Sequence, residues 1–550
     1  MTTTLVPPTW TTGSTEAIRT GTWRAAVPRH IAAPSPCHAA CPVGGDIAEW
    51  IGHARARDWR AAWNALVRHN PFPAIAGRIC HHPCESACNR GAYDEALSIC
   101  KLERYVGDIA LRERWRFDAP AREHGGRAAI VGAGPSGLSA AYQLRRRGWQ
   151  VSVFESQPLP GGLMRYGIPS YRLARDVLDA EIGRIADLGV KLHCSSPVAD
   201  AQAMQRLRRE HDAVYVAVGA AQVKRLPQLD YSQPWAVDGA AWLAACNSGR
   251  PLPLGADVIV VGGGSAALDA ARSARRAGHA VTIVSLESRA QMPAQPEEVA
   301  EALEEGITLL DGATLVAARS EGGGVGVELR RVRFVPGEQR GQFRIDEIVG
   351  SDFVMRADAV ITSIGQDPNL AALGNAAGAA RGRLLAIGAD HASTEPGVWA
   401  GGDVASMDRF VTAAVGHGER AAIAIEAARA GTAGAAGDGR STVPLRAIAT
   451  WYHPRSARAS VPLRPAAERL AGGDEVQLGL DAAQAVAEAE RCFSCGLCIA
   501  CDNCVHYCPD LAVKRADGGG YTVLGDYCKG CGLCVRECPT GSMEMIEEAK

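Results

Sequence analysis

The 550-residue sequence predicts an α/β protein with two parallel-sheet units in the middle and a cysteine-rich segment at each end. Two glycine loops carry the first part of this prediction, because each follows an apolar strand and opens a helical stretch. The cysteines carry the second part, since 16 of the 18 lie between residues 37 and 100 or between residues 492 and 538. At about 150 residues per domain, the length predicts three or four domains.

The composition excludes several classes of protein. Hydrophobic residues make up 47% and charged residues 21% of the chain, which is typical of a globular protein rather than a disordered one. A formal net charge of −2 gives no basic field, so we expect no nucleic-acid partner. No apolar run is long enough to cross a bilayer, and the first residues lack a charged start followed by an apolar core. We therefore expect no membrane span and no secretory signal.

The first strand–turn–helix unit opens at residue 126 and predicts a dinucleotide site. Its apolar strand is followed by glycines at G-x-G-x-x-G spacing: Gly132, Gly134 and Gly137. The first glycine permits a tight turn, the second lets a pyrophosphate approach the backbone, and the third lets the helix pack on the strand. Glu155 ends the next strand, where a carboxylate can bind the two ribose hydroxyls.

A second unit of the same plan opens near residue 256. Its loop has the permitted G-x-G-x-x-A form: Gly262, Gly264 and Ala267. Glu287 ends the following strand. Two such units in one chain predict two dinucleotides that face each other.

Two further glycine pairs indicate which dinucleotide each unit binds. They are Gly161-Gly162, shortly after Glu155, and Gly401-Gly402, which Asp403 follows. This arrangement is typical of flavoproteins, so we predict FAD on the first unit and a nicotinamide dinucleotide on the second. No C-x₂-C or C-x₄-C dithiol lies near either loop, which disfavours a flavin disulfide reductase.

Eight cysteines after residue 497 follow the pattern of a two-cluster bacterial ferredoxin. The motif C-x₂-C-x₂-C-x₃-C-P occurs twice, and the fourth cysteine of each motif ligates the other [4Fe–4S] cluster in this pattern. We therefore assign one cluster to Cys498, Cys501, Cys504 and Cys538, and the other to Cys508, Cys528, Cys531 and Cys534. Zinc is the alternative metal, which this repeat disfavours.

Eight more cysteines lie near the N-terminus or just before the tail. They are Cys37, Cys41, Cys80, Cys84, Cys88, Cys100, Cys492 and Cys495. Eight are enough for two more cubane clusters; the alternative is that the last two are free thiols. The C-x₂-C and C-x₃-C spacings indicate cluster ligation in a reducing compartment, so we expect a cytoplasmic protein. Cys194 and Cys246 are predicted to be buried small hydrophobes.

The motifs GAGPSG, FESQPLPGGLMRYGIPSYRL, GGGSAALD, SIGQDPN and AGGDVAS, with the cysteine-rich helical N-terminus, resemble the small subunit of glutamate synthase. The same residues, about 35–430, are similar to the N-terminal half of dihydropyrimidine dehydrogenase. The resemblance implies [4Fe–4S] clusters in the N-terminal domain and two sets of nucleotide-binding residues. For FAD these are Gly134, Pro135, Ser136, Glu155, Gly162, Leu163, Arg172, Gly402 and Asp403. For the nicotinamide dinucleotide they are Gly263, Gly264, Ser265 and Ala266, with Ile364 and Gly365 nearby.

The chain departs from the family pattern at three places. The family normally has a C-x₂-C before the position of Cys37, and no cysteine precedes Cys37 here. The family places a Gln or Glu ligand near the end of this domain; the matching residue is Glu103, and Cys100 beside it is a competing ligand. Relatives that use NADPH carry two basic residues where this chain has Leu286 and Glu287. We therefore predict NAD(H) in preference to NADP(H).

The missing C-x₂-C reappears, in sequence, just before the ferredoxin motif. We predict a cluster shared between the chain ends and held by Cys37, Cys88, Cys492 and Cys495. The other N-terminal cluster would use Cys41, Cys80 and Cys84, with Cys100 or Glu103 as the fourth ligand. Thiolate affinity slightly favours Cys100, whereas position favours Glu103. The predicted total is four [4Fe–4S] clusters.

These features divide the chain into six segments. They are an N-terminal helical Fe–S domain (1–125, opening with a loose arm over 1–30), an FAD-binding part (126–250), an NAD(P)-binding domain (251–365), a second FAD-binding part (366–430), a linker segment (431–490) and an α+β ferredoxin domain (491–550). Both dinucleotide domains are predicted to be Rossmann-like.

The predicted function is electron transfer. Hydride would pass between NAD(H) and FAD, and single electrons would pass through the clusters to or from a partner redox enzyme or ferredoxin. This step needs no acid–base residue, so no catalytic side chain is assigned. One candidate partner is a 2-oxoacid:acceptor oxidoreductase of the phenylglyoxylate dehydrogenase type. The alternatives are an NADPH-oxidising small subunit of glutamate synthase and a non-catalytic Fe–S scaffold subunit.

Overall fold

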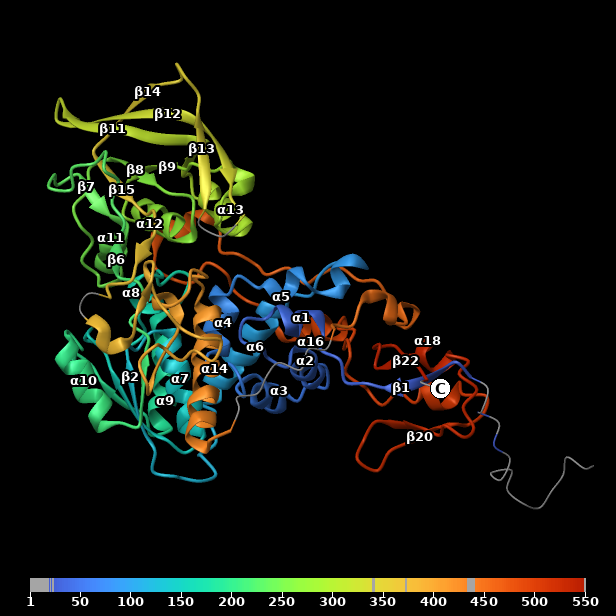
Figure 1. Cartoon of the computed structure of the whole chain (residues 1–550). Coiled ribbons are helices and arrows are strands. Elements are labelled where there is room, and N and C mark those ends of the chain that lie inside the picture. The colour runs from blue at the N-terminus through green and yellow to red at the C-terminus, as the bar shows by residue number, and fades with distance from the viewer. Residues whose placement is uncertain are drawn as a thin grey trace, which may run out of the picture.

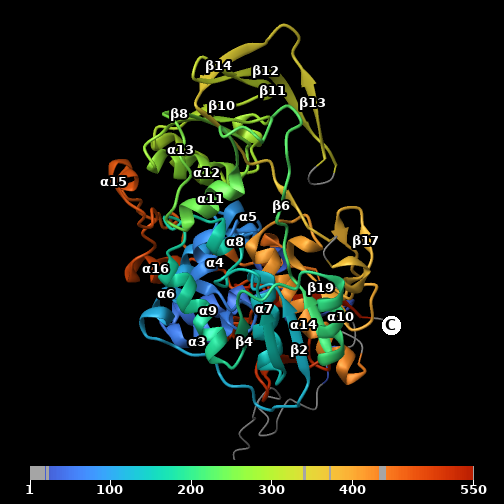
Figure 2. The ribbon, with the colours of Figure 1, turned by 90° about the vertical axis from the view of Figure 1, so that its left-hand side faces the viewer.

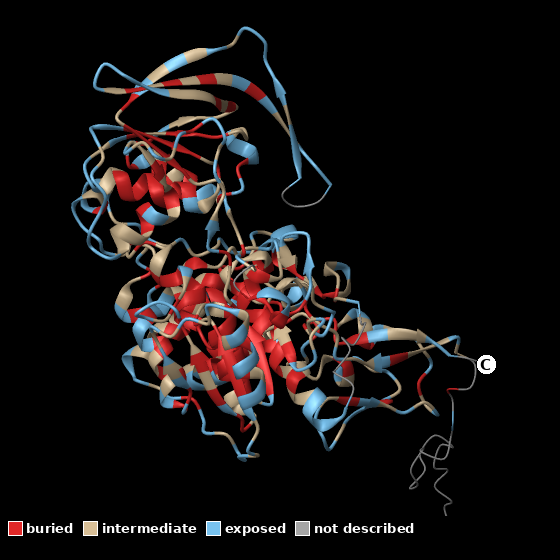
Figure 3. Ribbon diagram, turned by 60° about the vertical axis from the view of Figure 1, so that its left-hand side comes forward, coloured by how far each residue is buried: buried red, intermediate tan, exposed pale blue. Residues whose placement is uncertain are grey.

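The computed structural model describes residues 19, 21, 24–338, 342–370, 373–432 and 441–548. Figure 1 shows two sheet domains stacked at one side, a helical domain beside the lower one, and a small cysteine-rich domain at the far end. Buried residues concentrate in the sheets of both sheet domains and in the helices packed on them (Figure 3). Along the described ranges, no helix is both long and apolar enough to cross a membrane.

The first sheet domain contains five parallel strands in the order β19-β5-β2-β3-β4. Their bounds are β2 Arg127–Val131, β3 Gln150–Phe154, β4 Lys191–His193, β5 Ala213–Val216 and β19 Val398–Ala400. The helices are α7 Pro135–Arg146, α8 Leu163–Tyr166, α9 Arg175–Asp187, α10 Ala201–Glu210 and α14 Val411–Ala430. Strand β5 is buried throughout, as expected for a parallel sheet that helices cover on both faces.

The second sheet domain has five parallel strands in the order β10-β9-β8-β15-β7, below an antiparallel sheet that Figure 2 shows at the top. The parallel strands are β7 Ala236–Asp238, β8 Asp257–Val261, β9 Ala280–Val284, β10 Thr308–Leu310 and β15 Ala359–Thr362. The antiparallel strands are β11 Ala313–Glu321, β12 Gly324–Pro336, β13 Phe343–Glu347 and β14 Phe353–Ala357. The helices are α11 Gly239–Asn247, α12 Ser265–Arg276 and α13 Pro296–Glu304. The predicted α/β class is confirmed.

Short strands lie where the chain crosses between the two sheet domains. Strand β6 (Gln222–Val223) pairs antiparallel with β16 (Gln366–Asp367). The pairing joins the segment that leaves the first sheet domain to the segment that returns to it. A small hairpin, β17 (Ala380–Arg381) and β18 (Leu384–Leu385), follows in the first sheet domain.

The helical domain packs against the first sheet domain. Its helices are α1 Pro36–Ala40, α2 Ile47–Arg55, α3 Trp59–Leu66, α4 Pro73–Ile79, α5 Pro83–Ser86 and α6 Ile99–Arg112. Trp50 and Trp63 are buried, and each lies on the apolar face of its helix. Helix α4 contacts α9 and α14, which places the cysteines at its end beside the first sheet domain.

Residues 441–490, which we call the strap, are packed against the rest of the molecule, so the prediction of a linker over 431–490 needs correction. The strap contains α15 (Ala466–Ala471) and α16 (Ala482–Glu490). Helix α16 packs on α2 and α6 through fully buried Ala485 and Ala489, and α15 contacts α12. Only residues 433–440 of the predicted linker lie outside the described residues. The strap therefore spans from the second sheet domain across the helical domain.

The cysteine-rich domain at the end of the chain includes a strand from its beginning. Its elements are α17 Asn503–His506, β20 Val513–Arg515, β21 Tyr521–Val523, α18 Leu533–Arg536 and β22 Met543–Glu547. Strand β1 (Ala26–His30) pairs antiparallel with β22, so the prediction of a loose arm is wrong for these five residues. Residues 1–18, 20, 22 and 23 of that predicted arm lie outside the described residues.

Candidate functional site

The first glycine loop joins β2 to α7 and has the geometry that a dinucleotide needs. Gly132 has a φ of +105°, and a Cβ there would lie 2.5 Å from the carbonyl oxygen of Ala217. A Cβ at Gly137 would overlap the carbonyl oxygen of Gly132, so this glycine lets α7 pack on the loop. A Cβ at Gly134 would meet no atom within 4 Å, which keeps the helix N-terminus accessible. The loop therefore fits a pyrophosphate.

Glu155 follows β3 and faces the same loop. Its Oε2 accepts a hydrogen bond from the Ala133 N–H at 2.7 Å, and its Oε1 accepts one from the Gln157 N–H at 2.8 Å. The side chain is buried. Glu155 thus fixes the loop backbone from the position where a ribose bound to the loop would lie.

Two further segments pack against the N-terminus of α7. A Cβ at Gly162 would lie 2.9 Å from the Gly134 Cα, and a Cβ at Gly402 would lie 2.9 Å from the Ser136 Cβ. The Ser136 and Tyr215 hydroxyls share a 2.6 Å hydrogen bond. Most residues that the resemblance assigns to FAD therefore gather at one helix N-terminus or directly beside it: Gly134, Pro135, Ser136, Glu155, Gly162, Leu163, Gly402 and Asp403.

Arg172 reaches across to the second sheet domain. Its guanidinium donates to Asp269 Oδ2 at 2.7 Å and also pairs with Glu298. A cavity at this junction is lined by Arg172 and Glu298 together with His81 of the helical domain and Gln477 of the strap. The structure therefore gives Arg172 a bridging role between domains, whereas the resemblance implies a flavin contact.

The second glycine loop joins β8 to α12. A Cβ at Gly262 would overlap the carbonyl oxygen of Ser363, and a Cβ at Gly263 would lie 2.5 Å from Glu287 Oε2. Ser285 Oγ donates to the same carboxylate oxygen at 2.7 Å. Glu287 therefore lies directly over the loop. The other predicted residues flank it: Gly264, Ser265 and Ala266 where α12 begins, and Ile364 and Gly365 after Ser363.

Cys41, Cys80 and Cys84 come together in the helical domain. Burial, and then the nearby charges of Glu103 and Cys41, raise the pKa of the Cys80 thiol to about 12. Burial and the charges of Cys41 and Cys80 likewise raise the pKa of Cys84. Cys80 Sγ donates to Thr412 Oγ1 on α14 at 3.5 Å. This group of thiols therefore borders the first sheet domain.

The two candidates for a fourth ligand have different surroundings. Cys100 is buried, and its Sγ donates to a backbone carbonyl of α4 at 3.4 Å. Burial raises the pKa of Glu103 to about 7, and its Oε1 accepts a hydrogen bond from Asn70 Nδ2 at 2.7 Å. The charge of Glu103 adds to burial in raising the thiol pKa values of both Cys41 and Cys80. The charge of Cys100 likewise adds to burial in raising the pKa of Cys84, so both candidates lie near this group of thiols.

Four cysteines from opposite ends of the chain line one cavity: Cys37, Cys88, Cys492 and Cys495. Burial is the main reason that the pKa of Cys37 is raised, and the charges of the other three thiols add to it. Burial also raises the pKa of Cys492 to about 11 and that of Cys495 to about 12. These are the four residues that the sequence predicts for a shared cluster.

The tail cysteines form two groups. Burial is the main reason that the pKa of Cys504 is raised to about 12; the charges of Cys501, Cys538 and Cys498 add to it, and that of Cys534 adds least. Burial raises the pKa of Cys534 to about 11, and the charges of the Cys528, Cys508 and Cys531 thiols add to this effect. Each group takes one cysteine from the opposite motif, in the crossed arrangement of two-cluster ferredoxins.

Among the residues that the structure describes, no three His, Cys, Asp or Glu side chains lie close enough together to hold a single metal ion. Cys194 and Cys246 belong to none of these groups, and both are half-buried, whereas we predicted that they would be buried.

Several side chains that contact these sites have no sequence signal. Ser35 Oγ lies 3.1 Å from Cys37 Sγ, and Asn89 Nδ2 donates to Cys495 Sγ at 3.4 Å. His417 Nδ1 accepts from the Gly402 N–H at 3.0 Å. Motif spacing cannot reveal such residues, because their contacts depend on how distant segments pack.

Comparison with known proteins identifies each of these parts. Residues 126–428 match the family described as pyridine nucleotide-disulphide oxidoreductase. The chain belongs to this family. Residues 30–115 of this oxidoreductase match the 4Fe-4S cluster domain II of dihydropyrimidine dehydrogenase, and residues 497–543 match a 4Fe-4S dicluster domain. It is therefore an oxidoreductase and a flavoprotein that uses NAD(P) and carries [4Fe–4S] clusters.

Three curated proteins are similar to this oxidoreductase over most of its length. The beta subunit of an NADP(+)-dependent formate dehydrogenase from Moorella thermoacetica is 34% identical, over 84% of this chain and 70% of that one. The beta subunit of an NADPH-Fe(3+) oxidoreductase from Geobacter sulfurreducens is 31% identical, over 84% and 75%. The PreT subunit of an NAD-dependent dihydropyrimidine dehydrogenase from Escherichia coli is 32% identical, over 71% and 90%.

Proposed function

We propose that this chain is the nucleotide-handling subunit of a larger redox complex. It exchanges hydride between NAD(H) and FAD, and it passes single electrons through its cysteine-held clusters to or from a partner enzyme. When bound, FAD accepts a hydride from the nicotinamide and releases the two electrons one at a time. The chain's own residues bind and orient the two nucleotides and position the thiolates that would hold the clusters.

The position of α14 carries this proposal. A Cβ at Gly416 would overlap the carbonyl oxygen of Pro42, which directly follows Cys41. A Cβ at Gly418 would overlap the carbonyl oxygen of Ser136 in the first glycine loop. Residues two apart point to nearly opposite sides of a helix. Helix α14 therefore lies directly between the flavin loop and a cysteine group, and its glycines bring both within backbone contact.

Glu287 supports a preference for NAD(H). Its carboxylate lies over the second glycine loop, where it can accept hydrogen bonds from the adenosine ribose hydroxyls and would repel a 2′-phosphate. Leu286 beside it gives such a phosphate no positive partner. The relatives named above include NAD-dependent and NADP-dependent proteins, so the choice rests on these side chains.

Exposed aromatic side chains beside the ferredoxin cysteines support the proposal that electrons pass from this domain to a partner protein. Trp451 and Tyr507 are 58% and 50% exposed, and Tyr452 OH donates to Glu537 Oε2 at 2.6 Å. Cys531 is itself exposed. The three relatives are named as subunits, and we propose a partner of the same kind, such as a formate dehydrogenase or a 2-oxoacid:acceptor oxidoreductase.

Anaerobic titration of the purified chain with NADH tests the proposal. We expect NADH to bleach the visible flavin absorbance, and EPR signals of reduced [4Fe–4S] clusters to follow in the same sample. A non-catalytic scaffold would show neither change. If NADH leaves the flavin absorbance unaltered and NADPH does the same, the proposed function is wrong.

The fourth ligand beside Cys41, Cys80 and Cys84 gives a separate prediction. Because the Cys100 thiol already donates to a helix carbonyl, Cys100→Ala should leave the iron content unchanged. Glu103→Ala should remove about four irons per chain. Glu103→Gln should retain them, since the family that this chain resembles has Gln or Glu at the matching position. Iron analysis decides between the candidates. Loss of iron from Cys100→Ala, with none from Glu103→Ala, would make Cys100 the ligand.

A further inference from the structure

The cavity lined by Cys37, Cys88, Cys492 and Cys495 is built from both ends of the chain. Cys37 lies in the first turn of α1, and Cys88 follows α5 in the helical domain. Cys492 and Cys495 follow α16 at the end of the strap. The remaining lining is mostly apolar and includes Ile51, Leu97, Ile99 and Phe493. Four thiols facing one apolar cavity are the donor set of a [4Fe–4S] cluster.

Polar contacts hold these thiols in place. Ser35 caps α1 by accepting from the His38 N–H, and its Oγ also lies 3.1 Å from Cys37 Sγ. Asn89 Nδ2 donates both to Cys495 Sγ at 3.4 Å and to the carbonyl oxygen of Val443 at 2.9 Å. Asn89 follows Cys88 directly, so one side chain joins the helical domain to the strap and to the tail.

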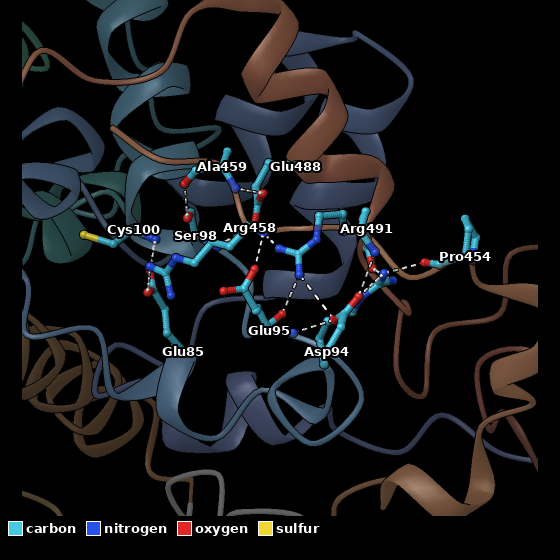
Figure 4. A network of polar contacts seen from close by, with 12 residues as sticks. Glu85, Asp94, Glu95, Ser98, Cys100, Pro454, Arg458, Ala459, Glu488 and Arg491 are labelled. Carbon is cyan, nitrogen blue, oxygen red and sulfur yellow. Dashed lines mark hydrogen bonds and ion pairs between the residues drawn. The ribbon is translucent and has the colours of Figure 1, made fainter. Parts of the chain in front are cut away.

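A network of charged groups holds the strap against the helical domain, and Figure 4 shows Asp94, Ser98, Glu488 and Arg491 of this network. Arg90 Nη1 donates to the carbonyl oxygen of Arg491 at 2.6 Å, while Arg90 also pairs with Asp94 at 2.7 Å. Arg491 Nη1 donates to Glu488 Oε1 at 2.7 Å, and the same oxygen accepts from the Ser98 N–H at 2.8 Å.

The charged groups of this network are buried, so their stability depends on the contacts among them. Arg90, Glu488 and Arg491 are all nearly inaccessible to solvent, with exposures of 1%, 1% and 5%. Buried charges are stable only when they are paired and hydrogen-bonded. The network therefore helps to hold the residue before Cys492 in place.

We propose that Cys37, Cys88, Cys492 and Cys495 bind one [4Fe–4S] cluster that joins the helical domain to the ferredoxin domain. Each thiol releases its proton to solvent when it binds iron, and the four thiolates complete the coordination of the cluster. The cluster cross-links segments about 400 residues apart in the sequence.

Short helices connect this site to the next group of cysteines. Cys37 and Cys41 lie at the two ends of α1, so the length of about one helical turn separates their Cα atoms. Cys84 and Cys88 are related in the same way through α5. The shared site and the group beside α14 are therefore neighbours through two helices that contact each other.

A short length of chain also places the shared site close to the ferredoxin domain. Cys495 and Cys498 are three residues apart, so at most about 11 Å of extended chain separates their Cα atoms. Between them, the Gly496 N–H donates to the carbonyl oxygen of Thr540 at 2.7 Å, and Thr540 Oγ1 lies 3.7 Å from Cys538 Sγ. The shared site thus stands between the flavin-side group and the tail groups. Its role as the connection for electrons rests on the proposed function, whereas the ligation itself does not.

Replacing both strap-side ligands tests the inference. The Cys492→Ser, Cys495→Ser variant of the full chain should contain about four fewer irons than the wild type, out of about 16. The ferredoxin clusters should keep their EPR signals, and NADH should still bleach the flavin. Cys88→Ser, on the other chain end, should remove the same EPR signal. Cys246→Ser, which changes a cysteine outside every group, is the matched control and should keep all the iron.

Trypsin digestion provides a second readout that does not depend on activity. Loss of the cluster should expose the strap, so the double variant should be cut within residues 441–497 faster than the control. Unchanged iron in the double variant, or a signal that disappears from it but persists in Cys88→Ser, would overturn the inference. If the wild type fails to bleach with NADH, the proposed function fails, whereas the iron counts still test the shared site.

Discussion

Replacing Cys531 with alanine is expected to lower electron delivery to a soluble two-cluster ferredoxin by at least about 100-fold, because even residues that only support metal ligands commonly contribute 10- to 100-fold. Cys531 is exposed and belongs to the tail group without Cys498, the tail cysteine nearest in sequence to the shared site, so its loss should remove the cluster farther along the chain from that site. Flavin bleaching by NADH should be unaffected, since the glycine loops lie in other domains. Stopped-flow absorbance separates the two steps.

The same measurement on Cys246→Ser provides the control, which should match the wild type in both steps. If Cys531→Ala reduces the ferredoxin as fast as the wild type does, electrons leave from the N-terminal cysteine groups, and the tail has another role. A deletion of the whole tail would be less informative. It would remove β22, the partner of β1, and also the contact between the Ala449 N–H and the Cys538 carbonyl oxygen.

Replacing Glu287 with serine is expected to lower the preference for NADH over NADPH by at least about 100-fold. A like charge beside the 2′-phosphate costs several kcal/mol, and each 1.4 kcal/mol is about tenfold in affinity. The change should appear mainly as a higher kcat/KM for NADPH, because the serine removes the repulsion and leaves the nicotinamide end untouched.

Glu321→Gln is a suitable control for this variant, because it removes a carboxylate from an exposed strand of the antiparallel sheet in the same domain. Its ratio of kcat/KM values should equal that of the wild type. An unaltered ratio in Glu287→Ser, or a wild type that already prefers NADPH, would contradict the assignment of Glu287.

The parts of the fold that local spacing controls could be predicted from the sequence. Each glycine loop must follow a strand and open a helix, so the two parallel sheets and the α/β class could be inferred from residues such as Gly132 and Gly262. The crossed grouping of the tail thiols follows from spacing too, because the ferredoxin motif carries its own geometry.

Features that depend on distant pairing could not be predicted in the same way. Residues 26–30 are a short segment with no motif. They form a strand because their backbone pairs with that of β22. The strap contains neither a glycine loop nor a cysteine motif that would place it, yet buried partners such as Glu488 and Arg491 hold it against the helical domain. Arg172 was assigned through a resemblance, and its two carboxylate partners come from the opposite domain.

The pairing of β1 with β22 also affects how the protein is made. A ribosome that adds about 5–20 residues per second completes Met543–Glu547 roughly 25–100 s after Ala26–His30 has been synthesised. During that interval the two sheet domains can fold, whereas the first strand has no partner. Iron loading of the ferredoxin domain is therefore a late event in the life of each molecule. The synthesis of β22 therefore sets the earliest time at which the ferredoxin domain of this oxidoreductase can complete its fold.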